Sequence, residues 1–323
     1  MAHHVLVSAP YIIPVLARFR PRLEQAGLRL MVASVRERLS EEELMVYAGE
    51  MDGAVCGDDR FSSRVLRAAA PRLRVISKWG TGIDSIDWDE ASRLGIKVFN
   101  SPGAFTEAVA DSVLGSVLAF ARRIPWSDRE MKAGGWRKLP GRALHECTLG
   151  VIGVGRIGRA VLRRASPFGI RLLGNDTVPV EPEFVGEVGV EMVTLPRLLE
   201  ESDFVSVNCD LNPTSLQLIN ADALRRMKAS AVLINTARGP IVDEKELTAA
   251  LEGGRLAGAA LDVFVEEPLP ESSPLRRMEN VLLSPHNTNS SPQAWERVHR
   301  NTLANLLRGL ELEVPADWEP IGS

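Results

Sequence analysis

The stretch Thr148-Leu-Gly-Val-Ile-Gly-Val-Gly-Arg-Ile-Gly158 decides the fold of this chain. Its apolar, β-branched beginning is typical of a buried parallel strand, and three glycines follow at GxGxxG spacing. Gly153 permits a tight turn, Gly155 lets a pyrophosphate group approach the backbone, and Gly158 lets the next helix pack closely on the strand. The amides that begin this helix would face the phosphates. The stretch therefore predicts a dinucleotide site.

An acidic residue strengthens this prediction. A second apolar run, residues 170–173, leads to Asp176, which lies 18 residues after Gly158. A carboxylate at this distance is typical of the group that accepts hydrogen bonds from an adenosine ribose. Residues 177–184 contain no Lys or Arg that could bind a 2′-phosphate, which favours NAD over NADP. The alternative is a ligand-free strand-to-helix turn with a solvated Asp176.

The composition indicates an ordinary globular protein with two domains. The chain has 323 residues, 45% of them hydrophobic and 25% charged. A net charge of −4 and the lack of a Lys/Arg block argue against a nucleic-acid partner. Cys56, Cys147 and Cys209 are scattered, so neither a metal site nor a disulfide framework is predicted, and a reducing, cytoplasmic setting is expected.

Two apolar segments raise the question of a membrane or a signal peptide. No Lys or Arg precedes the first segment, residues 5–17, and Pro10 and Pro14 interrupt it, so a strand and a helix are predicted instead. The second segment, a predicted helix over residues 105–123, contains Asp111 and is too short to span a bilayer. We therefore expect no membrane segment.

Short apolar runs alternate with helical patterns along most of the chain, which predicts an α/β protein with two doubly wound parallel sheets. Residues 124–147 are predicted to be an irregular, exposed linker or arm. The last helix is expected to pack back on the first domain and to make it discontinuous. The first domain is predicted to have strands at residues 5–9, 30–33, 53–56, 73–76 and 96–99 and helices at 12–26, 41–49, 62–70 and 88–94. The second is predicted to have strands beginning at residues 149 and 170 and strands at 204–207, 231–235, 258–263 and 281–284, before a last helix at 293–310.

Three predicted strands of the second domain end in residues that suit hydride transfer next to a carboxylate. Arg238 could hold the carboxylate and polarise the carbonyl group. His286 could exchange the hydroxyl proton, and Glu267 could stabilise the imidazolium. Each has an ordinary alternative: a surface ion pair, a solvated acid or a core histidine. Their occurrence at successive strand ends beside a nucleotide turn favours catalysis.

Over nearly its whole length the sequence resembles the D-isomer-specific 2-hydroxyacid dehydrogenases, the family that includes D-3-phosphoglycerate dehydrogenase. The motifs that carry this resemblance are Lys78-Trp-Gly-Thr-Gly-Ile-Asp-Ser-Ile-Asp87, Asn100-Ser-Pro-Gly, Ala108-Val-Ala-Asp111, residues 148–158, Asn235-Thr-Ala-Arg-Gly239, Ala260-Leu-Asp-Val-Phe264, Glu267-Pro-Leu-Pro270 and Ser284-Pro-His286.

The resemblance implies an NAD-dependent enzyme that interconverts a small anionic D-2-hydroxy acid and its 2-oxo acid. Arg238, Glu267 and His286 fall on the family's catalytic triad. The backbone of Lys78, Trp79, Gly80, Thr81 and Gly82 falls on the loop that holds the substrate carboxylate. The residues that match the family's NAD contacts are Thr81, Arg156, Ile157, Asp176, Cys209, Thr236, Ala237 and Asp262, with Asp262 near the nicotinamide.

The family fold implies a Rossmann NAD-binding domain, here residues 104–287, and a discontinuous flavodoxin-like substrate domain, here residues 1–103 and 288–323. A cleft that closes on substrate and a homodimer built through the Rossmann domains are also implied. No further regulatory domain is expected, since the chain stops soon after its last helix.

The sequence departs from the family near the substrate. Gly57-Asp58-Asp59-Arg60 replaces an Arg-Ser pair of the phosphoglycerate type, Asn287-Thr-Asn-Ser-Ser291 replaces a small apolar run, and Asn208-Cys-Asp-Leu-Asn-Pro213 replaces a segment rich in His and Pro. From charge alone, Lys78, Arg60 and the asparagines favour a more anionic substrate, such as a phosphorylated or phosphonate acid.

Other functions remain open at this point. Relatives with the same scaffold act on glyoxylate or hydroxypyruvate, formate or phosphite. A dinucleotide-sensing binding protein or corepressor without turnover is the alternative from another class. The complete triad favours the enzyme.

Overall fold

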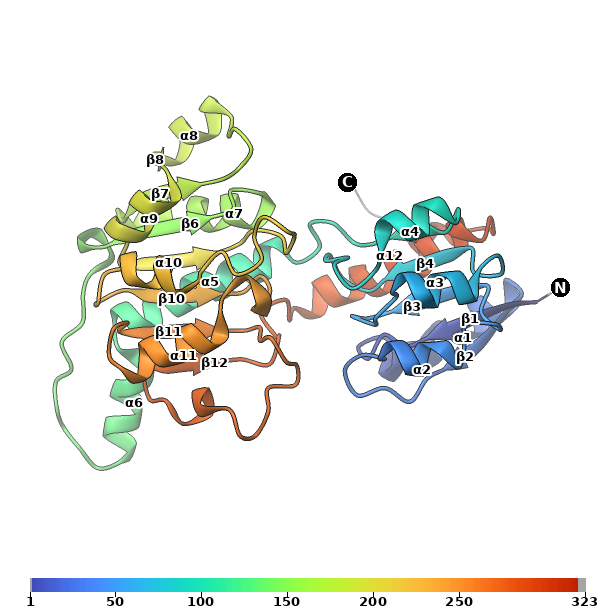
Figure 1. Cartoon of the computed structure of the whole chain (residues 1–323), viewed down its shortest axis with the longest axis horizontal. Coiled ribbons are helices and arrows are strands. Elements are labelled where there is room, and N and C mark those ends of the chain that lie inside the picture. The colour runs from blue at the N-terminus through green and yellow to red at the C-terminus, as the bar shows by residue number, and fades with distance from the viewer. Residues whose placement is uncertain (1, 319–323) are drawn as a thin grey trace. The chain divides into compact units, whose positions relative to one another are not determined.

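The computed structural model describes residues 2–318, and its contacts divide the chain into two compact units. Unit 1 contains the residues up to Phe105 and those from Ser291 onward, and unit 2 is Thr106–Ser290. Each unit is built on one parallel sheet with helices against it (Figure 1). The predicted fold class, two parallel-sheet α/β domains, is confirmed. The chain changes unit after residues 105 and 290, next to the changes predicted after residues 103 and 287.

The seven strands of unit 2 have the order β12-β11-β10-β9-β6-β7-β8, which is the Rossmann order with one added strand. The order reverses between β6 and β9, and ligands bind at such a reversal, outside the carboxyl ends of the strands. The glycine stretch follows β6 at this point. The strands are β6 (Thr148–Ile152), β7 (Arg171–Asn175), β8 (Val190–Met192), β9 (Phe204–Val207), β10 (Val232–Asn235), β11 (Gly258–Leu261) and β12 (Val281–Leu283).

Both faces of this sheet are buried. On β6, Val151 belongs to the core shared with α5 and α7, and its neighbour Ile152 belongs to the core shared with α9, α10 and α11. Successive side chains of a strand point to opposite faces, so a continuous apolar run fits a sheet covered on both sides. The helices are α5 (Thr106–Ala121), α6 (Ile124–Lys132), α7 (Arg156–Ala165), α8 (Pro182–Val188), α9 (Leu195–Glu201), α10 (Ala221–Arg226) and α11 (Glu244–Glu252).

Unit 1 has the strand order β2-β1-β3-β4-β5, which is the flavodoxin-like order. The last helix of the chain, α12, packs on β3, β4 and β5. A Cβ on Gly309 of this helix would lie 2.2 Å from the side chain of Val75 on β4, so helix and sheet approach closely. The elements are β1 (His3–Val7), β2 (Leu28–Val32), β3 (Gly53–Cys56), β4 (Val75–Lys78), β5 (Lys97–Phe99), α1 (Arg20–Gln25), α2 (Glu41–Met45), α3 (Ser63–Ala69), α4 (Trp88–Arg93) and α12 (Pro292–Gly309).

Two predicted segments are wrong. The predicted helix over residues 12–26 is a 3₁₀ helix, η1 (Ile13–Arg18), followed by α1, because Pro21 cannot donate the backbone hydrogen bond of a continuous helix. The segment 124–147 begins with a helix, α6, and is irregular only beyond it. This helix has no fully buried residue, so it lacks the apolar stripe by which helices are predicted. The short edge strand β8 was not predicted either.

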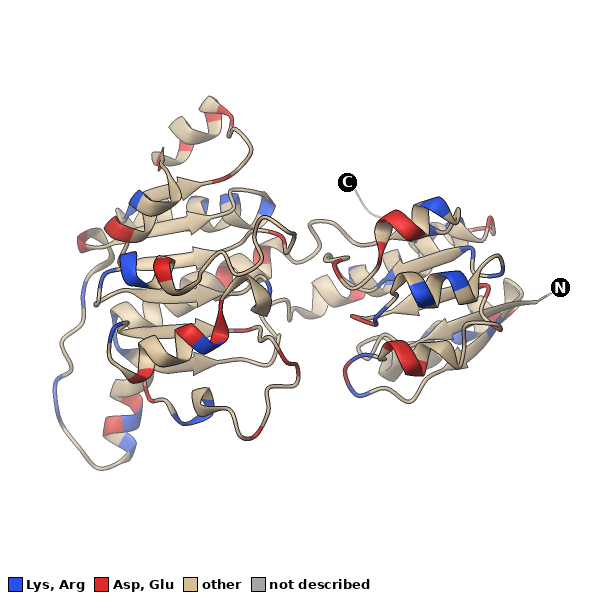
Figure 2. Ribbon diagram, in the orientation of Figure 1, with Lys and Arg blue, Asp and Glu red and all other residues tan. Residues whose placement is uncertain are grey.

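Acidic and basic residues lie next to one another on the helices of both units (Figure 2). Around β7 and α9, for example, Arg171 pairs with Glu191 and Glu201, and Arg197 pairs with the same two acids. In the described residues, no helix is long and apolar enough to cross a membrane.

Candidate active site

The three glycines after β6 differ in whether the surrounding chain leaves room for a side chain. Gly153 has φ +87°, and a Cβ there would lie 2.6 Å from the backbone nitrogen of Cys209. A Cβ on Gly158 would lie 2.0 Å from the carbonyl oxygen of Gly153. Gly155, with φ −76°, is exposed and no atom lies within 4 Å of its Cβ position. Since the described chain does not itself require a glycine at 155, the open space before α7 fits a bound pyrophosphate.

Asp176 lies directly after β7, beside the glycine turn. Its carboxylate accepts hydrogen bonds from the backbone nitrogens of Val154 (2.6 Å) and Val178 (2.9 Å). A carboxylate has about four acceptor positions, so ribose hydroxyls can still bind. The guanidinium of Arg159, on α7, pairs with Glu181. This pairing engages a cation that could otherwise bind a 2′-phosphate. At the start of α7, Arg156 is exposed and Ile157 is partly buried.

The ends of β9 and β10 leave two polar atoms without hydrogen-bond partners in the described part of the chain, Asn208 Oδ1 and Thr236 Oγ1. Buried polar groups normally have partners, and a bound ligand can provide them. Cys209 follows Asn208, and burial raises the pKa of its thiol to about 11. The edge of the sheet at β6, β7, β9 and β10 thus fits a dinucleotide.

Arg238 is placed by Asn235, for which the sequence predicted no role of its own. Asn235, the buried last residue of β10, accepts a hydrogen bond from the nitrogen of Ala237 (3.1 Å) and donates one to the carbonyl oxygen of Arg238 (2.9 Å). The guanidinium of Arg238 donates to the carbonyl oxygen of Ala237 at 2.8 Å. The Asn235 side chain therefore forms the turn that presents Arg238.

Glu267 and His286 form a hydrogen-bonded pair. Glu267 Oε2 lies 3.0 Å from His286 Nδ1, and Glu267 Oε1 accepts from the nitrogen of Phe264 at 2.9 Å. The His286 side chain is 22% exposed, and its backbone has φ +50°, which is unusual for a residue other than glycine. With Nδ1 directed at the carboxylate, Nε2 is the ring nitrogen that can exchange a proton with a substrate.

Asp262 shapes the loop that carries His286. Its carboxylate, in a residue that is 2% exposed, accepts from the nitrogen of Asn287 (2.8 Å), from the nitrogen (3.1 Å) and hydroxyl (2.6 Å) of Thr288, and from the Ser284 hydroxyl. The segment 287–291 is therefore partly an internal structural element, and Ser291 caps α12. The implied contact between Asp262 and the nicotinamide stays a prediction.

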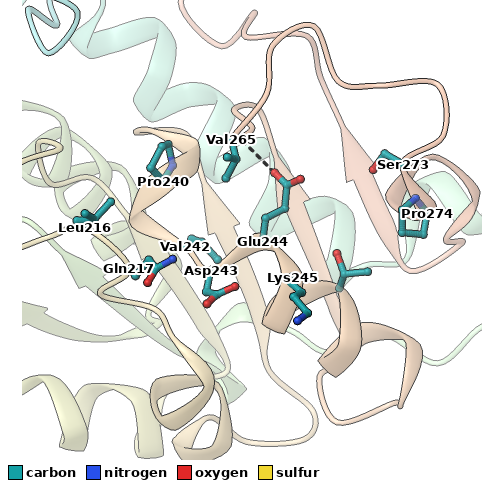
Figure 3. Close-up of a pocket in the computed structure, with 11 residues that line it drawn as sticks. Leu216, Gln217, Pro240, Val242, Asp243, Glu244, Lys245, Val265, Ser273 and Pro274 are labelled. Atoms are coloured by element: carbon teal, nitrogen blue, oxygen red, sulfur yellow. Dashed lines mark hydrogen bonds between the residues drawn. The ribbon is translucent and has the colours of Figure 1, made fainter.

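The loops that carry the triad pack backbone against backbone. A Cβ on Gly239 would lie 2.0 Å from the carbonyl carbon of Phe264 and 2.5 Å from the nitrogen of Val265. The backbone nitrogen of Val265 donates to Glu244 Oε2 at 3.0 Å, as Figure 3 shows. Both residues line a surface pocket of about 640 Å³. Because β10, β11 and β12 are neighbours in the sheet, Arg238, Glu267 and His286 follow strands that end at one edge.

In unit 1 the loop after β4 contains backbone amides that have no acceptor in the described residues. Gly80, Thr81 and Gly82 donate their amides to no acceptor in the described part of the chain. The loop is fixed instead by the Trp79 indole, which donates to Nδ1 of the buried His299 at 3.0 Å. Burial lowers the pKa of His299 to about 4, so its ring is a neutral acceptor. A run of free amides suits a carboxylate.

Known proteins resemble both the sequence and the structure. The family model "D-isomer specific 2-hydroxyacid dehydrogenase, NAD binding domain" matches residues 114–288, which lie inside unit 2. A glyoxylate reductase of Korarchaeum cryptofilum is 43% identical over 76% of this chain and 76% of its own, and one of Thermofilum pendens is 41% identical over 85% and 83%. The chain belongs to the D-isomer-specific 2-hydroxyacid dehydrogenases.

The fold of the whole chain is similar to that of a solved structure. The TT0316 protein of Thermus thermophilus is 35% identical, covers 97% of this chain and 98% of its own, and has a TM-score of 0.83. From its family and its relatives, this D-2-hydroxyacid dehydrogenase is an NAD-dependent oxidoreductase that interconverts 2-hydroxy and 2-oxo acids. The comparisons support the enzyme and not the sensor or corepressor alternative.

Proposed function

We propose that this dehydrogenase reduces glyoxylate or another short 2-oxo acid to the corresponding 2-hydroxy acid, D-configured where C2 becomes chiral, with Arg238, Glu267 and His286 as its catalytic residues. The hydrogen-bonded pair of Glu267 and His286 carries this proposal. The substrate class is supported by the names of the two relatives above, both glyoxylate reductases.

The proposed residues have complementary roles in the reduction. Bound NADH would supply the hydride for C2 of the substrate. Protonated His286 donates its Nε2 proton to the carbonyl oxygen, so that the products are the hydroxy acid and NAD. Glu267 orients the ring and stabilises its charged form through Nδ1. Arg238 binds the carboxylate and polarises the carbonyl group, which a planar guanidinium can do through two parallel hydrogen bonds.

The amides of Gly80, Thr81 and Gly82 in unit 1 are the proposed donors of hydrogen bonds to the substrate carboxylate. The proposed NAD contacts are the glycine turn with Arg156 and Ile157, the Asp176 carboxylate, and Cys209, Thr236 and Ala237 at the next strand ends, with Thr81 and Asp262 as further contacts. Thr236 Oγ1 is buried without a hydrogen-bond partner in the described residues, which supports this set of NAD contacts.

We also propose a cytoplasmic homodimer. Ile124 and Met131 on α6 and Trp136 in the segment that follows are strongly exposed apolar side chains in unit 2. Ile124 and Met131 are seven positions apart and so lie on one face of α6. An apolar helix face that is left exposed is typical of a protein interface. The cytoplasmic setting rests on the scattered cysteines alone.

The first experiment is a panel of 2-oxo acids with NADH, assayed by absorbance, with His286→Ala as the control. We expect turnover of glyoxylate or hydroxypyruvate, and a fall in kcat of about 10²–10⁴-fold in the variant, because that is the usual contribution of a general acid. NADH binding, measured by fluorescence titration, should persist. Near-normal turnover by His286→Ala would refute its role.

A further inference from the structure

Two neighbouring acids follow β3, and they have different surroundings. The Asp59 carboxylate is fully buried and accepts from the Ser8 hydroxyl (2.7 Å) and the nitrogens of Leu39 (2.5 Å) and Gly57 (3.1 Å). These bonds fold the turn. The Asp58 carboxylate is 31% exposed, and its Oδ1 lies 2.8 Å from Nζ of Lys78.

Lys78 is the last residue of β4, and its side chain is only 4% exposed. Its Nζ lies 3.4 Å from the carbonyl oxygen of Trp79 and 3.6 Å from the Cβ position of Gly80. The ammonium therefore lies against the backbone of the loop whose amides are free. A buried charge requires a partner, and Asp58 supplies the opposite charge.

The position of this ion pair in the sheet points to a ligand. Ser8 and Asp58 follow β1 and β3, between which the strand order of unit 1 reverses. Ligands of open parallel sheets bind outside the carboxyl ends of the strands at such a reversal. A substrate carboxylate can bind the free amides of Gly80–Gly82. A second anionic group near Lys78 would meet a cation that the half-buried Asp58 carboxylate already neutralises, so it would gain little attraction there.

We propose that Asp58 is a specificity-determining residue that limits the substrate to 2-oxo acids with a single negative charge. This inference rests on the proposed function, in which the amides of Gly80–Gly82 bind the substrate carboxylate. A phosphorylated or phosphonate substrate was predicted in part from the charge of Lys78. Because Asp58 neutralises this charge, Lys78 no longer favours such a substrate.

The test compares kcat/KM for hydroxypyruvate and 3-phosphohydroxypyruvate, which differ only in the phosphate. The wild-type protein should prefer the plain acid. In Asp58→Asn the ratio of plain to phosphorylated acid should fall about tenfold or more, as expected when one charge near a second anion is removed at intermediate dielectric constant. Lys78→Met, which leaves Asp58 uncompensated, should shift the ratio in the opposite direction.

The matched control is Asp59→Asn, in which the neighbouring acid is removed. It should lower the melting temperature through the loss of turn-forming hydrogen bonds and leave the ratio within about twofold. An unchanged ratio in a folded Asp58→Asn protein, or a wild-type preference for the phosphorylated acid, would overturn the assignment of Asp58. If Asp58→Asn does not fold, a falling ratio in Lys78→Met would overturn it.

The two proposals fail in different ways. Turnover of hydroxypyruvate with ratios that do not respond to Asp58 or Lys78 would remove only the specificity assignment. A wild-type protein that binds NADH and reduces neither acid, nor any other 2-oxo acid, would overturn the proposed function and this assignment together.

Discussion

The carboxyl edges of the two sheets present reactive groups in opposite ways. In unit 2 the loops after β10 and β11 pack backbone on backbone at Gly239 and Phe264, and side chains such as His286 remain partly exposed. In unit 1 the side chains of Trp79 and Lys78 are buried and hold the loop, and the amides of Gly80–Gly82 have no acceptor in the described residues. The same α/β architecture can thus offer either side chains or backbone, depending on which of them is used for packing.

Gly239→Ala should break the unit 2 arrangement and have the largest effect in this comparison. Its Cβ would meet the carbonyl carbon of Phe264 at 2.0 Å, so the loops that carry Arg238 and Glu267 would have to separate. Displacements of about 1 Å in a catalytic site can cost about a hundredfold, and we expect a loss of kcat/KM of at least that size. Steady-state kinetics and the melting temperature measure this.

A suitable control for Gly239 is Gly186→Ala. Gly186 is exposed on α8 and has no atom within 4 Å of its Cβ position. Alanine should leave activity unchanged there and stabilise the helix by about 0.5–1 kcal/mol. Activity within threefold of wild type in Gly239→Ala would show that the backbone contact does not hold the triad.

The pH dependence of the free energy of unfolding tests whether buried His299 holds the loop of unit 1. Its pKa is lowered to about 4 by burial, below the value of about 6.5 expected in the unfolded chain. As the pH falls from 7 to 5, the unfolded state takes up a proton that the folded state does not. The free energy of unfolding should therefore decrease by about 2 kcal/mol through this group.

Denaturant unfolding of the wild type and of His299→Gln at pH 7 and 5 measures this term. Glutamine can still accept a hydrogen bond from Trp79 but does not titrate, so the decrease should be smaller in the variant by about 2 kcal/mol. Equal decreases in both proteins would mean that His299 does not hold the loop as a neutral buried acceptor.

Substitution of Glu244 is expected to have the smallest effect on kcat/KM. Its carboxylate accepts from the nitrogen of Val265, two residues before Glu267. Glu244→Ala should lower kcat/KM about tenfold, which is the size expected for a hydrogen bond to a charged group. Glu244→Gln, whose amide oxygen also accepts, should recover most of the activity.

The pH profile and a control variant distinguish a positioning role of Glu244 from a simple loss of structure. A positioning role for Glu244 should also shift the pH profile of kcat/KM in Glu244→Ala, because Glu267 supports the imidazolium of His286. Lys245→Ala, at the exposed neighbour on α11, should change neither the rate nor the profile. A lower rate with an unshifted profile in Glu244→Ala would contradict positioning.

Much of the architecture could be predicted from local patterns. Gly53–Cys56 and Phe204–Val207 were predicted with the observed bounds, since continuous apolar runs between turn residues leave little choice. The exposed helix α6 and the edge strand β8 could not be predicted, because neither has a strong apolar period. The break before α1 does follow from the sequence, because Pro21 lies at its start.

The sequence alone determined the fold class, the glycine turn and the residue types at the three strand ends, because each depends on neighbours within a few positions. Tertiary structure decided how those residues are used. Asp262 folds the loop of His286, Lys78 is neutralised by Asp58, and the Trp79 indole is held by His299. These contacts join residues 20 or more positions apart, and only the packing of strands and α12 brings them within hydrogen-bonding distance.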